Sequence, residues 1–193
     1  MPLLLASSSA IRRAMLDAAG VEYSAVPAGL DEAAVKARLA DAADIAGSLA
    51  DAKALSVSAD HPDDWVIGSD SVVEVGGRLF DKPADRAAAA DHLAAFSGQP
   101  MRLTSAVALA RGGHIDWRFT DRATLFVRDL SPGFIDDYLD REWPEVGYCV
   151  GVFRMEGLGV HLFDRVEGSH FTILGMPLIA LLGALRDRGL IMP

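Results

Sequence analysis

The sequence lacks several features that would mark a secreted or membrane protein. Cys149 is its only cysteine, which excludes an intrachain disulfide and a cysteine zinc cluster. No run of about 18 apolar residues occurs, so no membrane-spanning helix is expected. The apolar start over residues 1–6 has no basic leader and is too short for a signal peptide. These absences fit a cytoplasmic protein.

Positive charge is scarce as well. Lys and Arg number 18 against 27 Asp and Glu, which gives a net charge of −9. This balance argues against a non-specific binder of nucleic acid or of an acidic membrane, although a phosphate-bearing small molecule needs only a local basic pocket. The five histidines show no His-Glu-x-x-His spacing, and no Gly-x-Ser-x-Gly elbow occurs. A zinc hydrolase and a serine hydrolase are therefore not expected.

The 193 residues are 51% hydrophobic and 7% aromatic, which predicts a single domain over residues 1–193 with a mainly aliphatic core. Periodicity, caps and glycine positions predict helices over 10–19, 84–95, 131–140 and 177–188, and two more within 30–59 that are broken near Gly47. Strands are predicted over 3–6, 21–26, 65–75, 101–110, 114–127 and 160–165. Helices and strands do not alternate strictly, which favours a mixed α/β (α+β) fold with a mixed sheet over a doubly wound one.

A cluster of hydroxyl and guanidinium groups stands where the first predicted helix begins. Ser7, Ser8 and Ser9 follow the first strand, and Arg12 and Arg13 belong to the first helical turn. A helix N-terminus offers unpaired N–H groups and arginine adds bidentate donors, so this segment suits a triphosphate. The Gly-x-x-x-x-Gly-Lys-Ser/Thr pattern of a P-loop is absent. An ordinary serine cap beside two solvated arginines is the competing interpretation.

An aspartate lies inside the apolar strand predicted over residues 65–75. Asp70 is flanked by Gly68, Ser69 and Ser71, which are small and leave room for a ligand near the backbone. Charged groups are rarely buried without a partner, a metal or a catalytic task. We therefore favour a functional Asp70 over an exposed aspartate at a strand end.

Four other charged residues carry weaker signals. Lys53 in an alanine-rich helix and Lys82 at a strand exit are compact charges that suit phosphoryl oxygens, but each alone is interpreted as a surface lysine. Glu32 alone is interpreted as a favourable charge at a helix start. Glu156 could accept two N–H bonds from the Watson–Crick edge of guanine, but a plain turn glutamate is the simpler interpretation.

Taken together, these segments resemble the Maf family of nucleotide pyrophosphatases. The family's opening, Leu-Ala-Ser-x-Ser-Pro followed by arginine, corresponds to residues 5–13, in which Ala10 replaces the proline. The other matching segments are Ile67-Gly68-Ser69-Asp70, Lys82-Pro83, Leu93 to Gly98, and Gly175-Met176-Pro177-Leu178. Each motif is weak alone, but their order and spacing agree over nearly the whole chain.

The resemblance implies a fold related to the inosine triphosphate pyrophosphatases, with an elongated mixed sheet flanked by helices and two lobes around a cleft. It implies hydrolysis of a nucleoside triphosphate to the monophosphate and pyrophosphate, with a divalent cation such as Mg²⁺ or Mn²⁺. Asp70 matches the family's proton acceptor and joins Lys53 and Lys82 as a candidate catalytic residue. Ser7, Arg12 and Glu32 match positions at which the family handles phosphate and metal. Together with the neighbouring Ser9 and Arg13, they are the substrate-binding candidates. Glu32 and Asp70 are the candidate metal ligands.

Three positions in the family track substrate choice, and they correspond to Ile11, Ser71 and Glu156. The branch that acts on 7-methyl-GTP carries tryptophan, glutamine and glutamate there, whereas the thymidine/uridine triphosphate branch carries arginine, threonine and glutamine. Glu156 favours the 7-methyl-GTP branch. Ile11 departs from it, because isoleucine has no π face to stack on the cationic methylated base.

The sequence therefore predicts a metal-dependent pyrophosphatase of modified or non-standard nucleoside triphosphates. The alternatives are a non-catalytic nucleotide-binding regulator of cell division and a pyrophosphatase of the thymidine/uridine triphosphate type. No nucleic-acid or membrane partner is expected. A homodimer is a further expectation, since the family often forms dimers and the hairpin predicted over 101–127 has exposed edges.

Overall fold

The computed structural model describes residues 2–36 and 39–192, and the chain divides into two compact units. The terminal unit, which contains both chain ends, comprises Met1–Ser71, Thr104–Asp121 and Ser169–Pro193. The central unit comprises Val72–Leu103 and Arg122–Gly168. The cleft implied by the resemblance and the single-domain organisation stay predictions.

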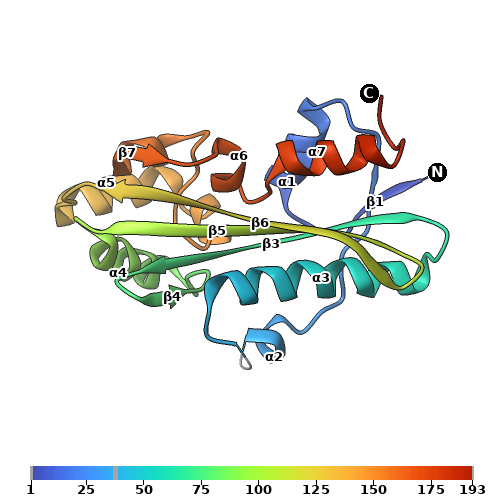
Figure 1. The fold of residues 1–193 in the computed structure, drawn as a ribbon. Coiled ribbons are helices and arrows are strands. Elements are labelled where there is room, and N and C mark those ends of the chain that lie inside the picture. Colours follow the sequence, from blue (N-terminus) through green and yellow to red (C-terminus); the bar gives the residue numbers. More distant parts are fainter. Residues whose placement is uncertain (1, 37–38, 193) are drawn as a thin grey trace. The chain divides into compact units, whose positions relative to one another are not determined.

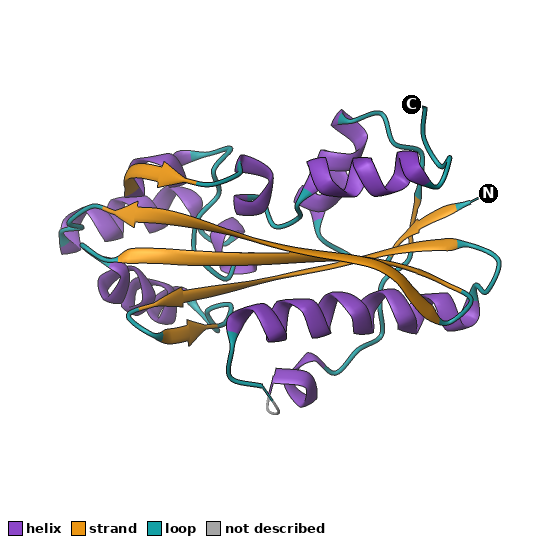
Figure 2. Ribbon diagram, in the orientation of Figure 1, coloured by secondary structure: helices purple, strands orange, loops and turns teal. Residues whose placement is uncertain are grey.

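A mixed sheet of seven strands runs through the chain in the order β2-β1-β3-β5-β6-β7, with β4 paired to β3 (Figure 2). The strands are β1 (Leu3–Leu5), β2 (Ser24–Ala25), β3 (Trp65–Val75), β4 (Arg78–Phe80), β5 (Pro100–Arg111), β6 (His114–Val127) and β7 (Phe163–Glu167). β1 is parallel to β2 and β3, whereas the β3–β4 and β6–β7 pairs are antiparallel. The predicted mixed α/β class is confirmed, although the strand predicted over 21–26 is reduced to β2.

Some of the helices begin where the sequence provides a capping side chain. They are α1 (Ala10–Ala18), α2 (Glu32–Lys36), α3 (Ala42–Asp60), α4 (Arg86–Phe96), α5 (Pro132–Glu142), α6 (His170–Ile173) and α7 (Leu178–Asp187), with 3-10 turns at Glu145–Tyr148 and Leu158–Leu162. The Asp41 carboxylate accepts from the backbone N–H of Ala43 and Asp44 at 2.8 and 3.2 Å and so starts α3. The predicted break near Gly47 is wrong, because Gly47 lies inside α3, where one glycine costs only about 1 kcal/mol. No helix among the described residues is long and apolar enough to cross a membrane.

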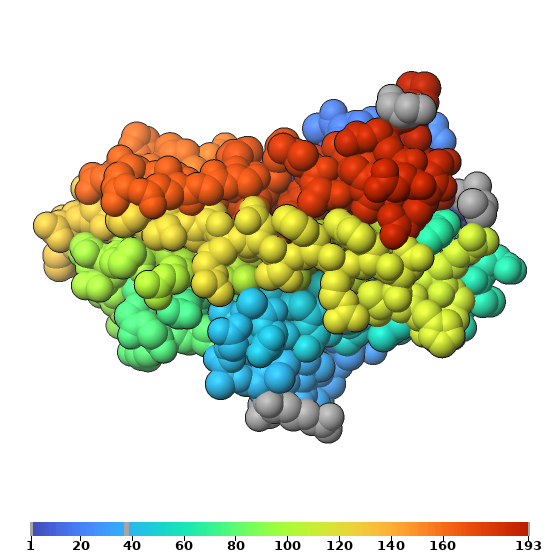
Figure 3. All heavy atoms as spheres, in the orientation of Figure 1, coloured from blue at the N-terminus to red at the C-terminus, as the bar shows by residue number. Residues whose placement is uncertain are grey.

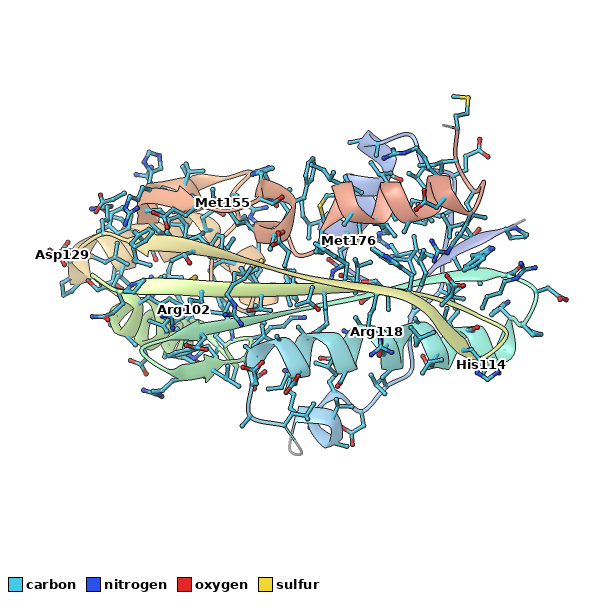
Figure 4. The ribbon with its side chains drawn as sticks, viewed as in Figure 1. Arg102, His114, Arg118, Asp129, Met155 and Met176 are labelled. Carbon is cyan, nitrogen blue, oxygen red and sulfur yellow. The ribbon has the colours of Figure 1, made fainter. Side chains whose placement is uncertain are left out.

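The core of the terminal unit joins the two ends of the chain. Met15 and Leu16 of α1 belong to one buried apolar cluster with Leu178 and Leu181 of α7 and with residues of β1, β3 and β5. The N-terminal helix and the C-terminal helix therefore lie side by side (Figures 1 and 3). Met176, labelled in Figure 4, is fully buried in the same cluster. This packing anchors the chain between α6 and α7 within the terminal unit.

Candidate active site

A lysine ammonium lies between two carboxylates in the terminal unit. Lys53 Nζ of α3 is 2.6 Å from Asp70 Oδ1 of β3 and 2.7 Å from Glu32 Oε1 of α2. The side chains of Lys53 and Asp70 are only 11% and 10% exposed, and Glu32 is 44% exposed. The structure thus brings together three residues that lie far apart in the sequence. From the sequence pattern alone, Lys53 and Glu32 were interpreted as ordinary surface charges.

Gly68 explains how a helical lysine reaches an aspartate on a strand. Side chains alternate between the faces of β3, so Gly68 and Asp70 belong to the same face, along which α3 runs (Figure 1). A Cβ at Gly68 would lie 2.1 Å from the Ala50 carbonyl oxygen and 2.6 Å from Ala54 N. Only glycine therefore admits α3 at this distance, and Lys53 lies in the turn of α3 that makes the approach.

The same three residues decide whether a divalent cation fits. Oxygens of Asp70 and Glu32 converge on one cationic point, the Lys53 ammonium. Mg²⁺ is commonly held by one or two carboxylates together with substrate phosphate oxygens. No group of three or more His, Cys, Asp or Glu suited to a metal occurs in residues 2–36 and 39–192. Asp70 and Glu32 therefore fit a cation that phosphate oxygens help to hold.

On the opposite face of β3, three polar side chains surround the carbonyl oxygen of Gly175. Arg12 Nε of α1 donates to it at 3.0 Å, and the hydroxyl oxygens of Ser69 and Ser71 each lie 3.1 Å from it. Arg12 Nη2 also donates to Ser71 Oγ at 3.3 Å. Gly175 has a φ of +102°, which favours glycine. These contacts hold the guanidinium through Nε and Nη2, and Nη1 takes no part in them.

Ser71 is tied into this network on a second side. Its Oγ lies 2.8 Å from Ser105 Oγ, and Ser105 Oγ donates to the Thr172 carbonyl at 2.7 Å. The Ser71 hydroxyl thus contacts Arg12, Gly175 and Ser105 at once. Its position among the residues that hold Arg12 indicates a structural link to a phosphate-binding candidate; the substrate-selecting role implied by the resemblance stays a prediction.

Arg12 is a half-buried cation with two anions nearby. Burial lowers the pKa of its guanidinium, and the carboxylates of Asp70 and Glu32 act in the opposite direction. A guanidinium stays protonated in proteins, so a desolvated Arg12 gains from an incoming anion with oxygen acceptors. The terminal unit therefore offers two cations, Arg12 and Lys53, together with a carboxylate that can take a proton.

The other predicted substrate-binding residues lie around the start of α1. Ser7 is 8% exposed, and its Oγ accepts from Ser9 N at 3.1 Å. Ser9 is the N-cap residue, yet its side chain makes no capping hydrogen bond. Ser9 is therefore not an ordinary serine cap, and the binding of an anion by this segment stays a prediction. Arg13 is exposed and Ile11 is half-buried.

Lys82 and Glu156 lie in the central unit, and both are exposed. Both act electrostatically on the thiol of Cys149. Burial raises the pKa of Cys149 to about 11, Glu156 acts in the same direction, and Arg154 and Lys82 lower it. Lys82 and Glu156 therefore lie within electrostatic reach of one thiol. A joint action of Lys82 with Asp70 stays a prediction.

Two features of the structure have no clear signal in the sequence. The Gly175 carbonyl holds Arg12, but the sequence marks Gly175 only as part of a motif. Glu142 at the end of α5 is 6% exposed and pairs with Arg154, although it lies beyond the helix predicted over residues 131–140. Neither a carbonyl orientation nor a long-range ion pair has a local pattern, so only the tertiary fold reveals them.

The chain is similar to known proteins over nearly its whole length. The family model described as "Maf-like protein" matches residues 2–188. A "Nucleoside triphosphate pyrophosphatase" of Nitrobacter hamburgensis is 46% identical over 192 residues, which cover 98% of this chain and 95% of that protein. A "7-methyl-GTP pyrophosphatase" of Rhizobium etli is 46% identical over 193 residues, which cover 98% and 97%. A solved nucleoside-triphosphatase (dITP/XTP pyrophosphatase) of Mycobacterium abscessus has a TM-score of 0.44 and 16% identity, over 98% of this chain and 96% of that one.

Proposed function

The chain belongs to the Maf-like protein family, and from this premise we propose that it hydrolyses nucleoside triphosphates to the monophosphate and pyrophosphate. The observation that carries the proposal is the Lys53 ammonium held between Asp70 and Glu32, with Arg12 nearby. Cleavage of a phosphoanhydride needs cations for the phosphate oxygens and a carboxylate for the attacking water. The terminal unit contains both.

In the proposed reaction, Asp70 orients the water that attacks the bond between the α- and β-phosphates and accepts its proton. Lys53 donates to Oδ1 of Asp70, which fixes the carboxylate and leaves Oδ2 for the water. Arg12 binds phosphate oxygens while the Gly175 carbonyl and Ser71 hold its guanidinium. Charge that develops on the leaving pyrophosphate is matched by these cations.

The proposed cofactor is Mg²⁺ or Mn²⁺, held by Asp70 and Glu32 together with phosphate oxygens of the substrate. When bound, the ion would supply positive charge to the oxygens that gain electrons as the anhydride breaks. The support is the donor set, because two carboxylates already share one cation at this position.

The proposed preferred substrate is 7-methyl-GTP. One relative carries that name, and Glu156 has two oxygens that can accept from N1–H and the exocyclic amine of guanine. Ile11 lacks an aromatic plane, so we expect only a modest preference of 7-methyl-GTP over GTP, and Ile11→Trp should increase it by about 0.5–2 kcal/mol. The thymidine/uridine triphosphate type is the alternative specificity.

A nucleotide panel tests the proposal. Purified protein is incubated with 7-methyl-GTP, GTP, UTP or dTTP in Mg²⁺, Mn²⁺ or a chelator, and both products are quantified. We expect equimolar monophosphate and pyrophosphate, with loss of turnover in the chelator. Release of inorganic phosphate and a nucleoside diphosphate would contradict the cleaved bond, and binding without turnover would support the regulator alternative.

A further inference from the structure

The central unit contains a buried carboxylate that the proposed reaction does not use. Glu142 Oε2 accepts from Arg154 Nη2 at 2.9 Å and from Nε at 3.1 Å, and Oε1 accepts from Leu158 N at 3.4 Å. The hydrogen bond to Glu142 raises the pKa of Arg154. A buried ion pair carries a large desolvation penalty and is weak evidence of a purely stabilising role. The hydrogen-bond partners of Glu142 indicate which segment the carboxylate holds in place.

The two partners of Glu142 stand at the two ends of a short loop, residues 154–158. Gly157 N donates to the Arg154 carbonyl at 3.2 Å, which closes the loop on itself. A Cβ at Gly157 would lie 3.4 Å from both carboxylate oxygens of Glu142, and a Cβ at Gly159 would lie 2.4 Å from the Arg154 carbonyl oxygen. The loop therefore packs directly against the Glu142 carboxylate. Met155, labelled in Figure 4, precedes Glu156, which is exposed in the turn.

A second residue of α5 holds the segment that leads into this loop. Tyr138, one helical turn before Glu142, donates its hydroxyl to the Val152 carbonyl at 3.0 Å. Val152 has a φ of 55°, a conformation that β-branched residues rarely adopt. Burial and the nearby Glu142 raise the pKa of Tyr138, so its hydroxyl remains a donor. One face of α5 thus fixes segment 152–158 at two points.

We propose that Glu142 is a positioning residue for nucleotide selection, which acts through loop 154–158 by fixing Glu156. The inference rests on the proposed function, in which Glu156 accepts hydrogen bonds from guanine. Such bonds weaken steeply with distance and angle, so a loop that shifts loses discrimination between bases. The phosphate-binding candidates Arg12 and Lys53 belong to the other unit.

The first test is Glu142→Gln, which keeps the size of the side chain and removes its charge. We expect the ratio of kcat/KM for 7-methyl-GTP to kcat/KM for UTP to fall about 5- to 20-fold, mainly through a higher KM for 7-methyl-GTP. The matched control is Asp140→Asn on the same helix, which removes an exposed ion pair with Arg86. The control should leave the ratio unchanged.

A double-mutant cycle separates positioning from general stability. In a Glu156→Gln background, Glu142→Gln should change the ratio less than about twofold, because both residues act through one contact. Arg154→Lys is a second variant that keeps the charge, loses the forked geometry and should lower the ratio to an intermediate value. It keeps the test decisive if Glu142→Gln does not fold.

The outcomes for Glu142 and for the proposed function differ. An unchanged ratio in folded Glu142→Gln or in Arg154→Lys would overturn the positioning role. A full effect that persists in the Glu156→Gln background would overturn it too. A wild-type protein that releases no pyrophosphate from any nucleotide would overturn the proposed function instead.

Discussion

The terminal unit and the central unit hold their charged residues in different ways. In the terminal unit, Lys53 and Arg12 are half-buried, and each is held by partners from two segments of the chain. In the central unit, Lys82 and Glu156 are exposed, and the buried ion pair of Glu142 supports a loop. Rigid cations suit phosphates, which all nucleoside triphosphates share. A loop whose position is fixed by a buried carboxylate suits recognition of the base, which differs among substrates.

This difference divides the expected effects of substitutions. A change at Asp70, Lys53 or Arg12 in the terminal unit should alter turnover of every nucleoside triphosphate by a similar factor. A change at Glu142 or Glu156 in the central unit should alter the ratio between nucleotides. The predictions for Asp70, Gly68 and Ser71 measure turnover and, where it applies, this ratio, and the prediction for Cys149 measures thiol reactivity.

The largest effect is expected for Asp70→Asn. The amide keeps the shape of the side chain but cannot accept the proton of the attacking water. We expect kcat to fall about 10²- to 10⁴-fold for all nucleotides, with KM little changed. Steady-state kinetics with a pyrophosphate assay measures the loss.

The control for Asp70→Asn is Glu74→Gln on the same strand. Glu74 pairs with Arg102, labelled in Figure 4, at 3.0 Å, and an exposed ion pair is worth about 0–1 kcal/mol. Its kcat should stay within about twofold of wild type. Near-normal turnover in Asp70→Asn would remove Asp70 from the proposed chemistry.

The next effect concerns the approach of α3 to β3. Gly68→Ala places a Cβ 2.1 Å from the Ala50 carbonyl oxygen, so α3 must move and Lys53 with it. We expect turnover of all nucleotides to fall about 10- to 100-fold, since small displacements at a reacting centre are costly, together with a lower Tm. Gly133→Ala is the matched control, because a Cβ there has no atom within 4 Å. A Gly68→Ala variant with normal turnover would show that the close approach is not required.

These contacts also show how far the sequence could lead. Asp70 was predictable, because an acid inside an apolar strand is unusual and the strand itself has a strong pattern. Lys53 was not distinguishable from a surface lysine without the resemblance, because its two partners come from other elements and its position depends on Gly68. Glu142 had no signal at all, since an acid at a helix end is common. The helix break near Gly47 was wrong because the Asp41 cap and the surrounding alanines outweigh one glycine.

A smaller effect is expected for Ser71→Ala, which tests whether Ser71 serves the phosphates or the base. Loss of the hydroxyl removes one hydrogen bond to Arg12, and such a bond is worth about 0.5–1.5 kcal/mol. We expect kcat/KM to fall about 2- to 12-fold for GTP and UTP alike. A changed ratio between the two nucleotides would instead support base selection by Ser71.

The smallest effect is expected in the reactivity of Cys149 in the central unit, which is measured on the whole protein without any nucleotide. The pKa of Cys149 is raised to about 11, so the reactive thiolate is scarce at pH 8, and alkylation should accelerate as the pH rises toward that value. Glu156→Gln removes an anion that raises the pKa of Cys149, so it should speed alkylation about 2- to 5-fold at pH 8. Lys82→Met removes a cation that lowers this pKa, so it should slow alkylation by a similar factor. Iodoacetamide labelling followed by mass spectrometry measures both rates, with Glu22→Gln, an exposed acid of the terminal unit, as the control. Opposite shifts in the two variants would confirm that both residues act electrostatically on this thiol, whereas shifts of the same sign would contradict it.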